Sequence, residues 1–220
     1  MKKFLLIAII GLIAGTVSAQ VIYVPRKVVR RRPPVQRVDD FYKVRLGITG
    51  GVSIANAVNA YNTYNSTGTI AGFNAGLTLD IPIAYPFIFA PEVLYSQKGF
   101  IAATDYGSFT QRNNYIDVPL LAKFHLAPNF NFLIGPQVSF PISTTQTYDT
   151  GFTSAEQQQY NTTNDKTILD GVIGVSFDLS SNVELRARYT IDLQPNDENT
   201  TLNGDYRNQV WQIGLGIKFE

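Results

Sequence analysis

Apolar and polar residues alternate with a period of two in eight runs along the chain. The first run begins with Val44 and Leu46, and the last ends with Ile217 and Phe219. One phase of every run is apolar and carries no charge. Such alternation is typical of β-strands whose two faces meet different surroundings. Eight strands with no convincing helix between them predict an all-β fold, an eight-stranded antiparallel up-and-down β-barrel with one apolar and one polar wall.

The polar phase decides which wall faces outward, because a soluble lipocalin-like barrel with an apolar pocket alternates just as cleanly. Over the eight strands, seven basic residues oppose seven acidic ones. The basic residues are Lys43, Arg45, Lys98, Lys123, Arg186, Arg188 and Lys218, and the acidic ones are Asp80, Glu92, Asp117, Asp170, Asp178, Glu184 and Asp192. Gly and Ser are mixed with them, whereas a soluble surface would be denser in Lys and Glu and poorer in Gly. We therefore predict that the polar wall lines the lumen and that the apolar wall faces lipid, as in a transmembrane barrel.

The N-terminus has the features of a secretory signal peptide, which we assign to residues 1–19. Lys2 and Lys3 precede an apolar stretch from Phe4 to about Ala14, and small residues before Gln20 supply a cleavage site. The apolar stretch is too short to span a bilayer comfortably, which disfavours the alternative of an N-terminal membrane anchor. The chain has no Cys, so a disulfide framework, a thiolate nucleophile and a Cys-based metal site are excluded.

Residues 20–41 are basic, and we predict that they form an extended periplasmic arm. The basic residues of this arm are Arg26, Lys27, Arg30, Arg31, Arg32 and Arg37. Together with Pro25, Pro33 and Pro34, they give a composition that cannot bury a core. One interpretation is a solvated linker. The other is contact with an anionic partner, either inner-leaflet phospholipid or a periplasmic protein, because a polybasic segment gains about 1 kcal/mol per basic residue near an anionic surface.

The connections between the runs alternate between long and short. The long ones are about 56–69, 101–111, 143–166 and 194–207, and the short ones are 82–86, 126–129 and 180–182. Transmembrane β-barrels have short periplasmic turns, longer extracellular loops and aromatic residues at both membrane interfaces. The aromatic residues of the apolar phase fall near both ends of the strands, as this topology requires. We therefore place residues 42–220 in the outer membrane as the barrel, with both termini in the periplasm.

Three segments carry a resemblance to a known family. Pro91–Gly99 reads PEVLYSQKG, Tyr115–Lys123 reads YIDVPLLAK and Gly135–Ser139 reads GPQVS. Together they resemble the small outer-membrane β-barrel family of the Bacteroidetes that includes PorT-type proteins, over about Tyr42 to Phe219. The resemblance implies an outer-membrane barrel and suggests a link to a secretion or transport apparatus.

Eight strands enclose a lumen just wide enough for side chains to fill, which disfavours a passive pore. Neighbouring strands are expected to place Arg45 beside Asp80, Glu184 beside Lys218 and Lys98 beside Asp117. Glu92, Arg186 and Arg188 are expected closer to mid-height, with the arginines as partners of Glu92. The predicted lumen charge network is Arg45, Asp80, Glu92, Lys98, Asp117, Lys123, Asp170, Glu184, Arg186, Arg188 and Lys218. Buried charges must be paired to be tolerated, which favours structural ion pairs. The functional alternative is a narrow, charge-lined conduction or gating path.

The sequence offers little basis for catalysis. His125 is the single histidine, and no Ser or Asp stands at a recognisable motif spacing from it. We expect no enzyme activity, no cofactor, no metal and no nucleic-acid partner. Two functional classes remain. The first is a structural or accessory barrel that contacts outer-membrane lipid and binds an envelope protein through its loops or its basic arm. The second is a small channel or uptake protein, which the narrow lumen disfavours.

Overall fold

The computed structural model describes residues 41–59, 67–104, 107–149, 154–160, 167–194 and 206–219. The predicted signal peptide at 1–19 and the arm at 20–41, apart from Phe41, lie outside the described residues. No helix in the described ranges is long and apolar enough to cross a membrane.

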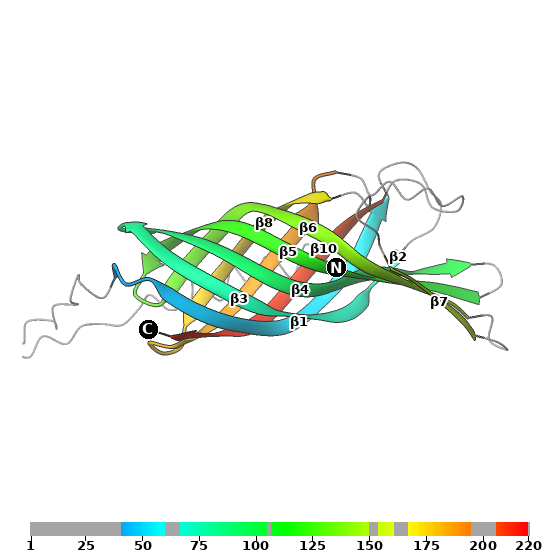
Figure 1. Cartoon of the computed structure of the whole chain (residues 1–220), viewed down its shortest axis with the longest axis horizontal. Coiled ribbons are helices and arrows are strands. Elements are labelled where there is room, and N and C mark those ends of the chain that lie inside the picture. Colours follow the sequence, from blue (N-terminus) through cyan, green and yellow to red (C-terminus); the bar gives the residue numbers. More distant parts are fainter. Residues whose placement is uncertain are drawn as a thin grey trace, which may run out of the picture. The chain divides into compact units, whose positions relative to one another are not determined.

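The described part of the chain forms β-strands whose pairings are all antiparallel (Figure 1). They are β1 (Arg45–Asn59), β2 (Thr67–Gly68), β3 (Ile70–Ala84), β4 (Phe87–Thr104), β5 (Gly107–Ala127), β6 (Phe130–Asp149), β7 (Ser154–Tyr160), β8 (Ile168–Asp178), β9 (Val183–Asp192) and β10 (Tyr206–Phe219). The strands are long because β-branched and aromatic residues alternate with polar ones over most of their length, a pattern that fits a pleated sheet.

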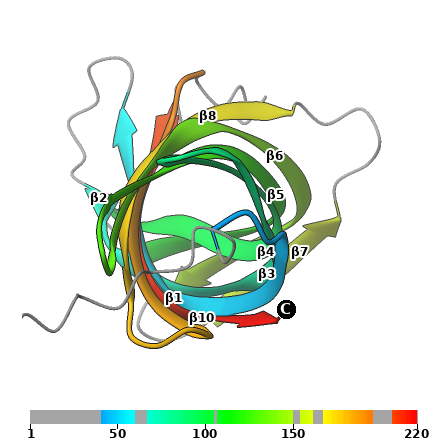
Figure 2. The same cartoon turned by 90° about the vertical axis from the view of Figure 1, so that its left-hand side faces the viewer.

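The sheet closes on itself (Figure 2). Strand β1 pairs with β3 on one side and with β10 on the other, where the register runs from Leu46 opposite Phe219 to Asn59 opposite Tyr206. The ring therefore follows the order β1, β3, β4, β5, β6, β8, β9, β10. These are the eight strands that the sequence predicts, and the predicted up-and-down barrel is confirmed.

The two walls also face as predicted. On the outside, Val52 is 58% exposed and Ile213 is 55% exposed, whereas Glu92 on the inside is 3% exposed and Asp117 is 1% exposed. This is the reverse of a soluble protein and matches the outward apolar band of a membrane barrel. The core of the molecule is thus the barrel interior, in which the buried polar and charged side chains of the described residues outnumber the buried apolar ones.

Three short connections lie together at one end of the barrel. Tyr85 and Pro86 join β3 to β4, Pro128 and Asn129 join β5 to β6, and Leu179–Asn182 joins β8 to β9. The other connections between ring strands, including the two-residue one between β4 and β5, lie at the opposite end, as the alternating strand direction requires (Figure 1). We call the two ends the turn end and the loop end.

The prediction that 101–111 and 143–166 are long loops is wrong for much of their length. β4 continues to Thr104, β5 begins at Gly107 and β6 continues to Asp149, where it pairs with β7. The segments are polar, but they contain Thr, Tyr and Phe, which favour strands. The backbone of each segment also forms hydrogen bonds with an antiparallel neighbour. We call this extension the projecting sheet; it comprises Gln97–Thr104, Gly107–Asn114, Ser143–Asp149 and β7 (Figure 1).

Candidate functional site

Ionic side chains bridge the lumen in three clusters, which succeed one another from the turn end to the loop end. The strands place them there because every second residue faces inward, so charges on one phase of several strands meet in the interior. Nearly all of these side chains are buried. Each cluster joins strands that are not neighbours in the ring.

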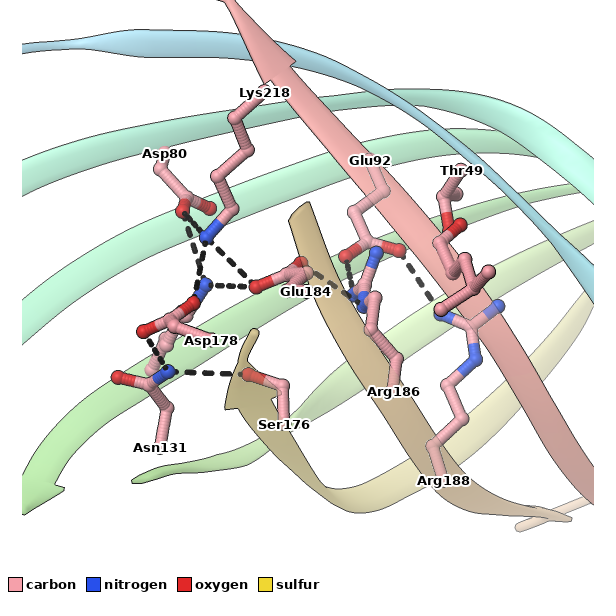
Figure 3. Close-up of polar contacts among 12 residues, drawn as sticks. Thr49, Asp80, Glu92, Asn131, Ser176, Asp178, Glu184, Arg186, Arg188 and Lys218 are labelled. Atoms are coloured by element: carbon pink, nitrogen blue, oxygen red, sulfur yellow. Dashed lines mark hydrogen bonds and ion pairs between the residues drawn. The ribbon is translucent and has the colours of Figure 1, made fainter. Parts of the chain in front are cut away.

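The turn-end cluster pairs two lysines with three carboxylates (Figure 3). Lys123 Nζ lies 3.0 Å from Asp80 Oδ2 and 2.9 Å from Glu184 Oε2. Lys218 Nζ lies 3.1 Å from Asp80 Oδ2, 2.7 Å from Glu184 Oε2 and 3.6 Å from Asp178 Oδ1. Because each lysine touches both Asp80 and Glu184, the four side chains form one closed network from β3, β5, β9 and β10. Losing any member would leave buried charge without its counter-charge.

The central cluster consists of Glu92, Arg186, Arg188 and Gln212. The two carboxylate oxygens of Glu92 are divided between the two arginines: Arg186 donates to Oε1, and Arg188 Nη1 lies 2.9 Å from Oε2 (Figure 3). Arg188 Nε also donates to Gln212 Oε1. Arg186 Nε lies 3.4 Å from Glu184 Oε1, which connects this cluster to the turn-end cluster.

The central cluster spans the full width of the barrel. Glu92 lies on β4 and both arginines lie on β9, and three strands separate β4 from β9 in either direction around the ring. A cavity of about 10 Å³ beside Arg186 and Arg188 has room for about one water molecule. The bridge therefore crosses the lumen at this level.

The loop-end cluster is centred on Lys98. Its Nζ lies 3.2 Å from Asp117 Oδ1, 3.2 Å from Asp170 Oδ2 and 2.9 Å from Ser139 Oγ. The ammonium group also lies 4.7 Å from the centre of the Tyr115 ring, a distance suited to a cation–π contact. Lys98 on β4 and Asp170 on β8 are separated by β5 and β6, so this contact too crosses the lumen.

Most of the predicted pairings are present in the structure. Lys98 contacts Asp117, Lys218 contacts Glu184, and Glu92 contacts both arginines. Arg45 lies opposite Asp80 in the β1–β3 register, as expected. The carboxylate of Asp80 contacts Lys123 and Lys218, two partners that the sequence did not predict.

Sequence reasoning missed the neutral members of the clusters. Ser139 Oγ lies 2.6 Å from Asp117 Oδ1 and 2.5 Å from Asp170 Oδ2, and Gln137 Nε2 donates to Asp170 Oδ2 at 2.6 Å. At the turn end, Asn131 Nδ2 donates to Asp178 Oδ2 at 3.0 Å. The available signal was their position on the polar phase next to a charged residue of an adjacent strand.

A family model described as the outer membrane protein beta-barrel domain matches residues 36–219. The chain belongs to this family. It is an outer-membrane β-barrel protein, and the charged clusters are the interior of a membrane barrel. No curated protein matches the chain.

Several solved structures resemble this outer-membrane barrel. Ail, the attachment invasion locus protein of Yersinia pestis, in complex with the heparin analogue sucrose octasulfate, is 14% identical with a TM-score of 0.48, over 80% of this chain and 99% of that chain. Neisserial surface protein A is 17% identical with a TM-score of 0.48, over 79% of this chain and 97% of that chain. The outer membrane protease OmpT from Escherichia coli is 8% identical with a TM-score of 0.41, over 80% of this chain and 96% of that chain. At these identities and scores the three structures say nothing about the activity of this chain.

Proposed function

We propose that the protein is a non-enzymatic structural or accessory barrel of the cell envelope whose lumen is closed by its own side chains. The observation that carries this proposal is the Glu92 bridge to Arg186 and Arg188, which joins opposite sides of the ring. The clusters above and below it cross the lumen as well. An eight-stranded barrel is filled by side chains of this size, so steady passage of solutes is not expected.

Conductance in planar bilayers tests the proposal. The unmodified protein should give no large, steady current. The triple variant Glu92→Ser, Arg186→Ser, Arg188→Ser removes the bridge without leaving an unpaired charge, and it should leak ions. A stable open channel in the unmodified protein would overturn the proposal and favour a small channel or uptake protein.

A second triple variant separates the role of volume from that of charge. Glu92→Leu, Arg186→Met, Arg188→Met keeps the centre filled but uncharged, and such replacements of buried ion pairs are often neutral or stabilising. We expect this variant to stay closed. If this variant carries as much current as the serine variant, the charges and not the side-chain volume keep the lumen closed.

The proposed orientation puts the turn end and both termini in the periplasm and the loop end outside the cell. Short turns on the periplasmic side are the rule for outer-membrane barrels. Because the chain has no Cys, single cysteines can be introduced at exposed positions in the two ends. On intact cells, a membrane-impermeant maleimide should label Ser154→Cys at the loop end and should not label Ser181→Cys at the turn end. The reverse labelling would invert the assignment.

Partners of the proposed accessory role are outer-membrane lipid around the apolar wall and an envelope protein bound through the loop end or the basic arm. A PorT-type link to a secretion or transport apparatus is part of this proposal and is supported by the sequence resemblance. Chemical crosslinking in native membranes, followed by co-purification, should recover an envelope protein. Deleting residues 21–37 should leave the barrel folded and reduce recovery if the arm is the contact. If the recovery of the envelope protein is unchanged, the contact lies at the loop end and not in the arm.

The surroundings of His125 support the non-enzymatic part of the proposal. Its Nδ1 lies 2.8 Å from Asn131 Oδ1, and its ring packs edge-on against Tyr85 with 6.3 Å between ring centres. A histidine that acts as a general base needs a nucleophile or a substrate proton within hydrogen-bond reach. The amide partner of His125 offers neither.

A further inference from the structure

The cavity beside the central cluster has a lining that carries positive charge and no negative charge. Its charged lining residues are Arg186 and Arg188 on β9, and no carboxylate lines it. The neutral polar residues of the lining are Thr49 on β1, Asn74 on β3 and Gln212 on β10. A space with this polarity suits a negatively charged occupant.

Glycines on two strands account for the empty space. Gly214 on β10 lies directly opposite Arg186 in the β9–β10 register and opposite Gly51 in the β1–β10 register. The wall beside Arg186 therefore has no side chain at these two positions. The arginines do not fold back into this space, because both extend across the lumen to Glu92 on β4.

Each guanidinium group has one terminal nitrogen without a protein partner. Arg186 uses Nη2 for Glu92 and Nε for Glu184, and Arg188 uses Nη1 for Glu92 and Nε for Gln212. In the described part of the chain, Arg186 Nη1 and Arg188 Nη2 make no hydrogen bond or ion pair. Neither nitrogen belongs to the fully buried atoms without a partner, so each retains surface that a small ligand can touch.

The negative charge available to the two arginines is limited. Glu92 is the one carboxylate among the described residues that contacts Arg188, and it is shared with Arg186. Glu184, which lies 3.4 Å from Arg186, also contacts both lysines of the turn-end cluster. A buried guanidinium group is costly unless its charge and its N–H donors are balanced. An anion in the cavity would supply both a counter-charge and an acceptor.

Hydrogen bonds fix the neutral side chains of the lining. Gln212 Oε1 already accepts a bond from Arg188, and Gln212 Nε2 lies 3.4 Å from Ser53 Oγ. The Thr49 hydroxyl donates to a backbone carbonyl of β10 at 3.1 Å, and Figure 3 shows Thr49 beside the guanidinium group of Arg188. The carbonyl oxygen of Gln212 is thus held toward an arginine, and the free N–H groups of the arginines are the charged groups that an occupant meets.

We infer that this cavity binds one chloride ion, held by Arg186 Nη1 and Arg188 Nη2. The cavity has room for about one water molecule, which a single-atom anion matches and a polyatomic anion such as phosphate or sulfate exceeds. Hydrogen bonds from a guanidinium group to an anion are charge-assisted, and they are stronger inside a protein than in water. The site is independent of whether the lumen conducts.

Urea unfolding of the full chain in lipid vesicles tests this inference, with chloride replacing gluconate at constant sodium concentration. Gluconate is too large for the cavity. Because chloride binds the folded state, the folding equilibrium constant should rise about tenfold when the chloride concentration is ten times its Kd. No saturable difference between chloride and gluconate would mean that water alone occupies the cavity, and would overturn the inference.

Two substitutions at Thr49 give a matched pair for this titration. Thr49→Val and Thr49→Met both lose the hydrogen bond to β10, but only the longer methionine reaches into the cavity. The valine variant should keep the chloride dependence and the methionine variant should lose it. If both variants respond to chloride equally, the ion binds elsewhere and the assignment is wrong.

Bromide, which gives an anomalous X-ray signal, locates the ion directly and keeps the test decisive if Thr49→Met fails to fold. Crystals of the full chain soaked in sodium bromide should show a peak between Arg186 Nη1 and Arg188 Nη2. Arg188→Lys keeps a cation beside Glu92 but has no second terminal nitrogen, so its peak should lose at least about half its occupancy. No peak in the unmodified protein, or equal peaks in both proteins, would contradict the site. A peak without any effect of chloride on unfolding would mean binding at crystal concentration only, and would also overturn it.

Discussion

Strand β5 passes through two regions whose outer faces have opposite polarities. In the barrel, its outward residues are Ile116, Val118 and Leu120, and the inward ones include Asp117 and Lys123. In the projecting sheet, its outward residues are Thr110, Arg112 and Asn114, and the inward ones are Phe109, Gln111 and Asn113. The alternation has the same period throughout, but the outward phase changes from apolar in the barrel to polar in the projecting sheet. Such a reversal is expected where a strand leaves lipid and enters water.

The position of the reversal is marked in the backbone as well. The β5–β6 register shifts between Asn114 and Tyr115, and an irregularity of this kind bends a strand and increases its local twist. Above it, Phe100 and Phe109 pack on the inner face with Ala57 in a small apolar cluster. Below it, the barrel interior holds the ion-pair clusters and also a buried apolar cluster of Ala90, Leu121, Leu133 and Val172. The barrel interior thus combines ion pairs with apolar packing, whereas the inner face of the projecting sheet combines the Phe100–Phe109 cluster with neutral polar side chains such as Gln111 and Asn113.

The largest expected effect comes from breaking the central ion pair of the barrel. Glu92→Gln leaves Arg186 and Arg188 buried without their shared carboxylate, and removing one partner of a buried pair costs about 3–5 kcal/mol. The free energy of unfolding can be followed in lipid vesicles by the fluorescence of the single tryptophan, Trp211, which lies on the outer wall.

Asp178→Asn is the matched control for this prediction. The Asp178 side chain is 28% exposed and its nearest oxygen is 3.6 Å from Lys218, so its loss should cost less than about 1 kcal/mol. If both variants lose the same free energy of unfolding, burial does not determine how much a charged side chain in the lumen contributes to stability.

The sequence predicts the ring and its two walls because a period-two pattern records directly which face each residue takes. It predicts the Lys98–Asp117 contact for the same reason, since those residues lie on neighbouring strands. It predicts the cross-lumen contact of Glu92 with Arg186 and Arg188 only from their common mid-height. It does not predict that Lys123 contacts Glu184, because the partner in a cross-lumen contact depends on strand tilt and stagger, which no single strand encodes. The projecting sheet was missed because outside the membrane the outer face is polar, so strands such as Thr110–Asn114 have the composition of loops.

A charge introduced on the outer face of β5 should sharpen the contrast between the two regions. Leu120→Arg places a guanidinium on the apolar wall, which should cost about 2–4 kcal/mol near the bilayer midplane. Thr110→Arg makes the same addition on the outer face of the same strand in the projecting sheet, and we expect a change within about 0.5 kcal/mol. Unfolding titrations of both variants in the same vesicles compare them directly. Equal costs would mean that the polarity reversal does not mark the membrane boundary.

The smallest effect on the barrel should follow from truncation of the apolar cluster in the projecting sheet. Phe100 is 3% exposed and its ring centre is 6.1 Å from that of Phe109, so Phe100→Ala removes most of the packing that orders this region. Amides of Gln97–Asn114 should lose hydrogen-exchange protection, by up to about 3 kcal/mol of local opening free energy. The barrel does not share this cluster, so its global unfolding free energy should fall by less than about 1 kcal/mol. A loss of protection that spreads to β8 and β9 would show that the two regions unfold as one unit, and their different interiors would then reflect environment alone.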